Sequence, residues 1–155
     1  MQFKYNSVDL VFLEKLAHFV ALNLKKCDSV SLVGDLGVGK TAFVRFLVNT
    51  LIPSEDVSSP TFSIINEYHS SEFIIYHVDL YRINSLSEVY DLGLDCICNN
   101  GICIVEWPNL LDGILNFNLR ININCSIREN LRDIEVITND SDWYNAFKKF
   151  IHQNN

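Results

Sequence analysis

Gly34-Asp35-Leu36-Gly37-Val38-Gly39-Lys40-Thr41 matches the pattern G-x-x-x-x-G-K-S/T at every fixed position. Residues 30–33 before it form a short apolar run typical of a buried strand, and residues 42–48 after it carry apolar side chains at helical spacing. A strand, a glycine loop and a helix in this order aim backbone N–H groups and a helix N-terminus at one point, where a di- or triphosphate can bind. The sequence therefore predicts a phosphate-binding loop (P-loop) with a nucleotide as its ligand.

Each residue of the P-loop has an expected role in binding. The Lys40 ammonium is expected to reach the β- and γ-phosphates, and the Thr41 hydroxyl to take a position on Mg²⁺. Glycines permit the tight turn and let the phosphates approach the backbone closely. The rest of the loop is expected to contact the nucleotide through its backbone, namely Gly34, Asp35, Leu36, Gly37, Val38 and Gly39.

The composition is that of an ordinary globular protein and limits the partners it can have. The 155 residues, 48% hydrophobic and 20% charged, suit a single domain over residues 1–155 with one substantial core. The formal charge of −7 argues against tight, unaided binding to nucleic acid, because neutralising phosphates requires a basic surface. A role on RNA would therefore act through a partner.

The sequence gives no indication of export or membrane insertion. No apolar run approaches the roughly 20 residues that cross a membrane, and residues 1–6 lack a signal-peptide pattern. The odd number of cysteines, five, then favours reduced thiols and a cytoplasmic location. Cys96, Cys98 and Cys103 form no C-x-x-C pair, so we interpret them as small buried hydrophobic residues rather than zinc ligands.

The N-terminal half is predicted to mix helices and strands around the P-loop. Ser7 is the expected N-cap of an amphipathic helix over residues 8–25. Residues 62–68 and 73–79 are predicted to form a hairpin joined by Ser70-Ser71, and the second strand is apolar enough to be buried on both faces.

The C-terminal half continues with short elements. A capping box formed by Ser85 and Glu88 begins a helix that is expected to end at Gly93. The further expected elements are a turn at Asn99-Asn100-Gly101, a buried strand over 102–106, a short helical piece after Pro108, a strand over 117–125 paired with 132–138, and a last helix capped by Asp140 or Ser141. Strict alternation over 117–125 favours an antiparallel strand near the sheet edge with one wet face. The predicted fold is a P-loop NTPase-like, three-layer α/β domain whose mixed sheet has a parallel centre and antiparallel additions.

Two carboxylates are candidates for completing a catalytic site. Hydrolysis of a nucleotide requires an acidic group for the metal and a group that places a water in line. Asp79 and Glu106 each end a predicted buried strand, and ligands of open α/β sheets bind at such strand ends. We expect at least one of them to face the metal, and the sequence leaves open which one positions water.

Several neighbours have two interpretations. Thr61, in the polar loop before the first hairpin strand, is either a hydroxyl that senses the γ-phosphate or part of a connecting turn. Trp107 either packs in the core or has a role in stacking or in contacting a partner. Arg82 either supports phosphate charge or forms a surface salt bridge. His77 lies within an apolar strand and is interpreted as a packed histidine rather than a base.

Four motifs in this order and spacing resemble one family. They are the P-loop, Ser59-Pro60-Thr61-Phe62, His77-Val78-Asp79-Leu80-Tyr81-Arg82 and Val105-Glu106-Trp107-Pro108. Over residues 29–108 the chain resembles the TsaE (YjeE) family of small bacterial ATPases, which are needed to make threonylcarbamoyladenosine in tRNA. The resemblance implies ATP with Mg²⁺ and weak hydrolysis by the isolated protein. It also implies docking onto the TsaD–TsaB pair, whose cycle ATP turnover resets, with tRNA contacted only indirectly.

The same resemblance implies roles for individual residues. Lys40 would hold phosphates, and Thr41 and Glu106 would be Mg²⁺ ligands. Asp79 would lie in the metal shell or position water, Thr61 would be the switch hydroxyl, and Trp107 would lie near the nucleotide or the partner.

The chain also departs from the usual pattern of the family. Ala42 occupies a position where the family frequently has a second threonine. Cys96 occupies the position after Leu-Gly-Leu-Asp, where the family often has an acidic residue. The N-terminal helix lacks the threonine often found near its start, which leaves adenine recognition unassigned.

Two other functions compete with an ATPase. A small-molecule or nucleotide kinase usually adds an arginine-bearing lid, whereas here Arg120, Arg128 and Arg132 are scattered. A guanine-nucleotide switch usually carries an Asn-Lys-x-Asp segment, and the sequence has none. Phosphate transfer to an added acceptor would identify a kinase, and competition between nucleotides would identify a guanine-nucleotide switch.

Overall fold

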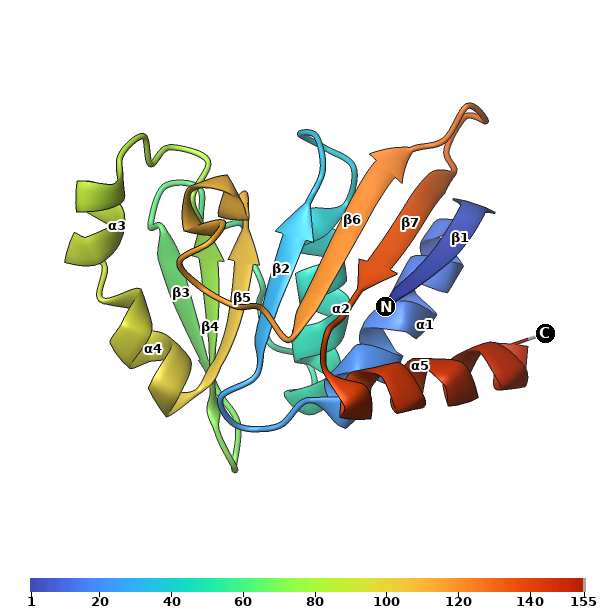
Figure 1. Cartoon of the computed structure of the whole chain (residues 1–155), viewed down its shortest axis with the longest axis horizontal. Helices are drawn as coiled ribbons and strands as arrows, with labels where there is room; N and C mark the ends of the chain where they lie inside the picture. The colour runs from blue at the N-terminus through green and yellow to red at the C-terminus, as the bar shows by residue number, and fades with distance from the viewer. Residues whose placement is uncertain (155) are drawn as a thin grey trace.

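The computed structural model describes residues 1–154, and their side chains as far as residue 152. A mixed sheet forms the centre of the molecule, with helices packed against it (Figure 1). The strands are β1 (Gln2–Val8), β2 (Ser29–Val33), β3 (Ile65–His69), β4 (Ile74–Asp79), β5 (Ile102–Glu106), β6 (Leu119–Cys125) and β7 (Arg132–Ile137). The helices are α1 (Leu10–Asn23), α2 (Lys40–Leu51), α3 (Leu86–Asp91), α4 (Leu94–Asn100), the 3-10 helix η1 (Pro108–Leu111) and α5 (Ser141–Asn154).

The strands lie in the order β1-β7-β6-β2-β5-β4-β3. β6, β2, β5 and β4 run parallel to one another. β7 and β1 extend the sheet antiparallel at one edge, and β3 does so at the other. The predicted fold class, a layered α/β fold whose sheet has a parallel centre and antiparallel additions, is confirmed.

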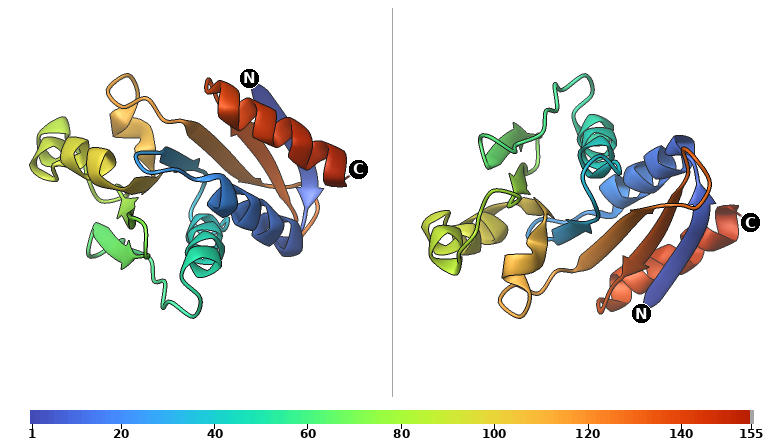
Figure 2. Two further views of the ribbon diagram at one scale, coloured as in Figure 1. Left: turned by 90° about the horizontal axis from the view of Figure 1, so that it is seen from below. Right: turned by 90° about the horizontal axis from the view of Figure 1, so that it is seen from above.

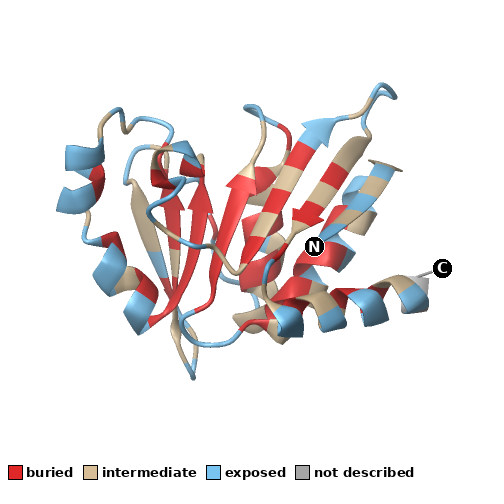
Figure 3. Ribbon diagram, in the orientation of Figure 1, coloured by how far each residue is buried: buried red, intermediate tan, exposed pale blue. Residues whose placement is uncertain are grey.

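Alternate side chains of β5 face different layers of the molecule. Ile102 and Ile104 belong to the core formed with α1 and α2, whereas Cys103 and Val105 belong to the core formed with α3, α4 and η1. Figure 2 shows these two groups of helices on opposite faces of the sheet. Every residue of β5 is buried, as Figure 3 shows, so the prediction of a buried strand over 102–106 is correct. A strand covered on both faces belongs at the parallel centre of a sheet.

The N-terminus differs from the prediction. Residues 2–8 form the edge strand β1, so Ser7 is not a helix N-cap. The cap of α1 is Asp9, whose Oδ1 accepts the N–H of Phe12 at 2.9 Å. Half-buried Phe3 and Tyr5 alternate with exposed neighbours, which is the period of a strand. That short pattern is stable as a strand only because β7, more than 120 residues away, supplies the hydrogen-bonding partner.

The segment after Gly93 also differs from the prediction. Gly93, with φ of 65°, ends α3 as expected but also begins α4. Asn99 and Asn100 therefore belong to a helix rather than a turn. Cys96 on this helix is exposed, while Cys98 and Cys103 are buried, so the interpretation as buried residues is wrong for Cys96 alone.

β6 lies deeper in the sheet than expected. Leu119, Ile121 and Ile123 are buried and the alternate polar residues are not, so the predicted wet face is correct, although Cys125 at the end of the strand is exposed. Its partner β7 is antiparallel, as predicted, but β2 on its other side is parallel. The alternation indicates that one face of the strand is not covered by a helix. It does not determine whether the neighbouring strands run parallel or antiparallel to β6.

Other predicted elements occur with adjusted bounds. β3 and β4 form the expected hairpin, although β3 begins only at Ile65, because Ile64 has φ of 67° and closes a turn with Pro60. Ser85 caps α3, and Asp140 rather than Ser141 accepts the first N–H groups of α5. None of the helices within residues 1–154 has the length and hydropathy that crossing a membrane requires.

Candidate functional site

A cavity of about 160 Å³ opens where β2, β4 and β5 end, the place where open α/β sheets bind ligands. The P-loop and the first turn of α2 form one wall of it. The side chains that line the remainder are Ser59, Thr61, Asp79, Tyr81, Glu106 and Trp107. The structure thus brings six of the residues singled out in the sequence to one place: Lys40, Thr41, Thr61, Asp79, Glu106 and Trp107.

The P-loop is fixed against the neighbouring strands. Gly34 has φ of 149°, and a Cβ there would lie 2.0 Å from the carbonyl oxygen of Ile123 in β6. Further along the loop, Arg132 of β7 donates from Nε to the carbonyl oxygen of Val38 at 3.1 Å. Only glycine allows so close an approach between two backbones. These contacts hold the P-loop against β6 and β7.

The start of α2 offers donors to an anion. Gly39, in a left-handed conformation with φ of 117°, occupies the N-cap position and supplies no side-chain acceptor. The N–H groups of the first turn are therefore not capped by a side chain at this position. Together with the positive end of the helix dipole they suit a phosphate group.

Lys40 lies within the loop rather than in solvent. Its ammonium donates to the carbonyl oxygens of Gly34 at 2.7 Å and Asp35 at 2.9 Å. It also lies 4.1 Å from the ring centroid of Trp107. Burial lowers the pKa of Lys40, while the carboxylates of Glu106, Asp79 and Asp35 oppose this by raising it. A phosphate with two or more negative charges would replace neutral carbonyl partners with a stronger, charge-assisted bond.

Glu106 is held by two donors although it is only 3% exposed. The Thr41 hydroxyl donates to its Oε1 at 2.9 Å. Nε2 of His77 lies 2.8 Å from the same oxygen, and His77 is completely buried. Glu106 therefore links the first turn of α2 to the centre of the sheet.

Asp79 is held by a different pair of donors. The Thr61 hydroxyl donates to Oδ2 at 2.7 Å, and the backbone N–H of Tyr81 donates to Oδ1 at 2.9 Å. The Ser59 and Thr61 hydroxyls are themselves 2.7 Å apart. The polar loop before β3 is thus tied to the end of β4 through the carboxylate of Asp79, and also through the N–H of Asp79, which donates to the carbonyl oxygen of Ile64 at 2.9 Å.

Two aromatic contacts shape the rim of the cavity. Trp107, with φ of 58°, packs its ring 5.0 Å from that of Tyr81 as well as over Lys40. Trp107 is also partly buried against the core cluster that includes Val105 and Leu111, so it takes part in core packing as well as lining the cavity. The guanidinium of Arg82 lies 4.1 Å from the ring centroid of Phe62 and does not line the cavity. Neither of the two interpretations of Arg82 describes this contact.

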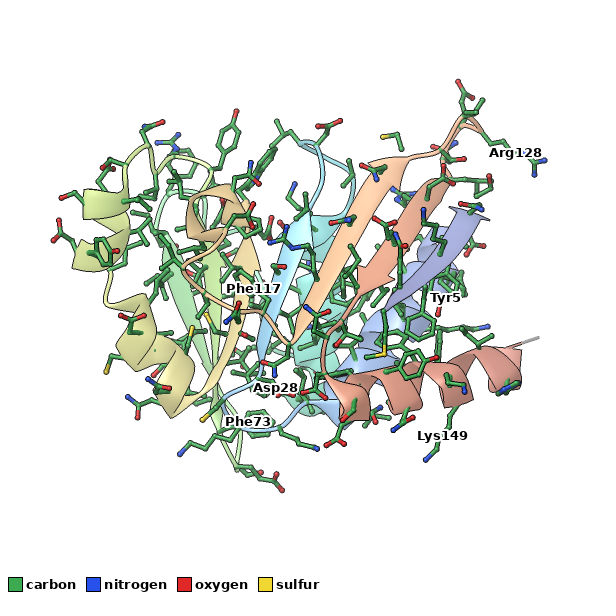
Figure 4. All side chains as sticks on the ribbon, in the orientation of Figure 1. Tyr5, Asp28, Phe73, Phe117, Arg128 and Lys149 are labelled. Carbon is green, nitrogen blue, oxygen red and sulfur yellow. The ribbon has the colours of Figure 1, made fainter. Side chains whose placement is uncertain are left out.

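The arginines of the C-terminal half do not gather over the P-loop. Arg120 pairs with Asp112, and Arg132 donates to the carbonyl oxygens of Val38 in the P-loop and of Asn130. Arg128 extends from the tip of the turn between β6 and β7 (Figure 4). Within the described residues, these arginines are therefore separate from one another and do not form the arginine-bearing lid of a kinase.

His77 is the site residue that the sequence interpretation missed. Packing inside an apolar strand is what the sequence indicated, and the side chain is indeed buried. However, His77 and Asp79 are two residues apart on β4 and so share a face of the sheet. That spacing is the signal in the sequence that could have placed His77 next to the site.

The oxygen donors at the cavity fit a hard cation bound together with a phosphate. Carboxylate and hydroxyl oxygens are the ligands that Mg²⁺ prefers, usually in small number and completed by waters and substrate phosphates. Within residues 1–154, no group of three or more His, Cys, Asp or Glu side chains could hold a metal ion. The donor set of Thr41, Glu106 and Asp79 thus suits Mg²⁺ with a nucleotide better than a metal bound by protein alone.

Comparisons with known proteins agree on one family. Residues 9–134 match the family model for "Threonylcarbamoyl adenosine biosynthesis protein TsaE". The chain is 39% identical over 131 residues to the "tRNA threonylcarbamoyladenosine biosynthesis protein TsaE" of Rickettsia felis, covering 83% of this chain and 76% of that protein. It is also 39% identical over 112 residues to the protein of that name from Bacillus subtilis, covering 72% and 70%.

A solved structure has the same fold. The crystal structure of YdiB from Bacillus subtilis superposes with a TM-score of 0.74 at 27% sequence identity. The superposition covers 100% of this chain and 97% of YdiB. The similarity therefore includes the edge strand β1 and the helix α5, which lie outside the region matched by the family model.

Proposed function

The chain belongs to the TsaE family, and we propose that it is a Mg²⁺-dependent ATPase that supports the threonylcarbamoyladenosine modification of tRNA. The names of its relatives support the pathway. The family resemblance suggests that it acts with the TsaD–TsaB pair and meets tRNA only through that pair. The acidic charge of −7 agrees with indirect contact, because a protein that binds RNA unaided needs a basic surface.

One observation carries the proposal. Lys40, Thr41, Asp79 and Glu106 come from three separate elements and meet at one cavity beside an uncapped helix N-terminus. A cation for phosphates, a hydroxyl, and two carboxylates are the parts that phosphoryl transfer to water requires. A P-loop alone would support binding only, so the carboxylates are what favour hydrolysis.

Each of these residues would have a distinct task. Lys40 would leave the carbonyl oxygens of the loop and bind the β- and γ-phosphates. Thr41 and Glu106 would hold Mg²⁺, which when bound neutralises charge on the phosphate oxygens. Asp79, fixed by Thr61 and by the Tyr81 N–H, would orient the attacking water, since its two oxygens are already held in place.

Thr61 would report the state of the nucleotide. Its hydroxyl bonds Asp79 at the mouth of the cavity, and its loop has no helix or strand structure of its own. A γ-phosphate that competes for this hydroxyl would free Thr61 from the Asp79 carboxylate, while the bond from the N–H of Asp79 to the carbonyl oxygen of Ile64 keeps the end of the loop in place. Such an ordering or release of a loop by the γ-phosphate is a common basis of nucleotide switches. A partner that contacts the loop would then distinguish ATP from ADP.

The test is ATP hydrolysis by the full chain, alone and with the purified TsaD–TsaB pair, with Mg²⁺ or with EDTA. We expect slow hydrolysis by the chain alone, faster hydrolysis with the pair, and none without Mg²⁺. Lys40→Ala should abolish activity, whereas Lys149→Ala, at an exposed position on α5, should not change it.

Other results would contradict the proposal. If the TsaD–TsaB pair does not change the rate of ATP hydrolysis, the proposal that this pair is the partner is wrong. Transfer of the phosphate to an added acceptor rather than to water would favour a kinase. Stronger competition by GTP than by ATP would favour a guanine-nucleotide switch.

A further inference from the structure

His77 is a buried polar side chain that makes one hydrogen bond, and that bond is to a proposed metal ligand. The residue has no exposed surface, and its Nε2 lies 2.8 Å from Oε1 of Glu106. In the described part of the chain its other ring nitrogen, Nδ1, has no hydrogen-bond partner. The polar contact of the imidazole is therefore directed wholly at Glu106. A buried polar group that leaves one of its atoms unpaired is costly, so a fold retains it for a reason.

The direction of this hydrogen bond follows from the chemistry of the two groups. An ionised carboxylate can only accept, so Nε2 carries the hydrogen and donates it to Oε1. The unpaired Nδ1 is then the acceptor nitrogen, which is less costly than a buried donor without an acceptor. The hydrogen bond to Glu106 thus determines the tautomer of His77. In return, the rigid, buried ring of His77 holds the carboxylate oxygen of Glu106 in position.

Glu106 has a second donor, but that donor faces the cavity. Thr41 bonds the same oxygen and is only partly buried, and it is itself a proposed ligand of Mg²⁺. Its hydroxyl must adjust when a nucleotide and metal arrive. The bond from His77 is shielded from water and lies beneath the cavity, so it can persist through that change. The buried donor is therefore the one suited to hold the carboxylate in a constant orientation.

We propose that His77 is a positioning residue that orients the carboxylate of Glu106 for Mg²⁺ bound with the nucleotide. This inference rests on the proposed function, in which Glu106 holds the metal. His77 itself touches neither nucleotide nor metal, because it is fully buried under Glu106. Residues that orient metal ligands in this manner typically change metal affinity by about 10–100-fold when they are replaced.

The experiment compares the dissociation constant for ATP in excess Mg²⁺ with that in EDTA, using the full chain. In the wild type, Mg²⁺ should tighten binding, and the ratio of the two constants measures the contribution of the metal. In His77→Phe we expect this ratio to fall about tenfold or more. The constant in EDTA should change by less than about twofold, because the P-loop contacts stay intact. A purely structural role would weaken binding equally with and without Mg²⁺.

Matched variants separate the hydrogen bond from packing. Ile104 is fully buried and lies directly opposite His77 in the register of β4 and β5. Ile104→Val should lower the melting temperature without changing the Mg²⁺ ratio. His77→Gln can still present an N–H near the position of Nε2 and should keep most of the ratio, whereas His77→Asn is too short and should lose it. The Gln and Asn pair carries the test if His77→Phe does not fold.

The outcomes distinguish this inference from the function on which it rests. A wild-type protein that binds no ATP under either condition overturns both proposals. A wild type with a clear Mg²⁺ effect that persists unchanged in His77→Phe, or in His77→Asn, overturns the role of His77 alone. If the Mg²⁺ ratio falls as much in Ile104→Val as in His77→Phe, the fall results from lost packing, and the proposed role of His77 is overturned.

Discussion

Asp79 and Glu106 are direct partners in the register of the parallel strands β4 and β5. Their side chains therefore leave the same face of the sheet next to each other, at the mouth of the cavity. Each is nevertheless fixed by its own donors, Asp79 by Thr61 and Glu106 by Thr41 and His77. One carboxylate is tied to the P-loop helix and the other to a loop, which agrees with the proposal that Glu106 holds the metal and Asp79 positions the water.

The Thr61 hydroxyl should matter more for hydrolysis than for binding of the product. Thr61→Val keeps the shape of the side chain but removes the hydrogen bond to Asp79. A hydrogen bond to a charged group contributes about 1.5–3 kcal/mol, so we expect a fall in the ATPase rate of about 10–100-fold. The dissociation constant for ADP should change by less than about threefold. The ATPase rate is measured by steady-state kinetics and the dissociation constant by calorimetry. Ser59→Ala, which leaves the Thr61–Asp79 bond in place, is the control, and an equal loss there would contradict the assignment.

Trp107 should report nucleotide binding by its fluorescence. Its ring lies 4.1 Å from the Lys40 ammonium, which must move when phosphates bind. The other tryptophan, Trp143, belongs to α5, is 4% exposed in the core and does not line the cavity at the P-loop. Titration with ADP should change the emission of the wild type and of Trp143→Phe to a similar extent. Retention of the change in Trp107→Phe would show that the emission change comes from Trp143, which contradicts the prediction.

Two glycines of the P-loop should differ in their effect on stability. At Gly37, with φ of 80°, a Cβ would meet open space, so Gly37→Ala should cost only the backbone strain of about 1–2 kcal/mol. At Gly34 a Cβ would also lie 2.0 Å from the Ile123 carbonyl oxygen, so the loop or β6 must shift. We expect Gly34→Ala to lose at least twice as much free energy of unfolding, measured in urea. Equal losses for the two variants would show that the P-loop can move away from β6 at little cost.

The carboxyl of Asp28 should make stability depend on pH. Burial is the main cause that raises its pKa above 3.8, aided by Asp140 and opposed by the N–H of Lys25 and by Trp143. An acid whose folded pKa is raised contributes most stability below about pH 3.8, and this contribution is lost as pH rises through the folded pKa. Asp28→Asn should thus have a higher melting temperature than the wild type at neutral pH, and the difference should shrink as pH falls toward 4.

Asp142 provides a control of opposite sign for that experiment. Its hydrogen bond from Lys25, at 2.8 Å, lowers its pKa, so its contribution is present above pH 3.8 and is lost as pH falls through the folded pKa. Because this pair is exposed, Asp142→Asn should lower the melting temperature only slightly at neutral pH. Identical pH profiles for the two variants would contradict the role of burial at Asp28.

Some elements could be predicted from sequence because their cause is local. The P-loop follows from eight consecutive residues, and in the cap of α3 the hydroxyl oxygen of Ser85 accepts the N–H of Glu88, three residues away. The buried strand β5 follows from a continuous apolar run bounded by polar residues. Asp79 and Glu106 could be placed at strand ends for the same reason, before anything was known of the order of the strands.

Other features depend on partners far away in the chain. The seven residues of β1 lie beside the start of an amphipathic helix, and only pairing with β7 decides their conformation. In β6, the pattern indicated a wet face, but parallel pairing with β2 comes from the order of the sheet. Periodicity within a segment reports which side is buried and carries no information about which segment covers it.

The sequence alone determined that this chain carries a P-loop motif between a strand and a helix, and which carboxylates end the adjacent strands. The tertiary structure decided that Asp79 and Glu106 stand side by side, that Thr61 holds the first, and that His77 holds the second from below. The physical reason is range. Turns, caps and amphipathic periods are made by residues a few positions apart, whereas these hydrogen bonds join residues 18 and 29 positions apart and form only once strand order and register are fixed.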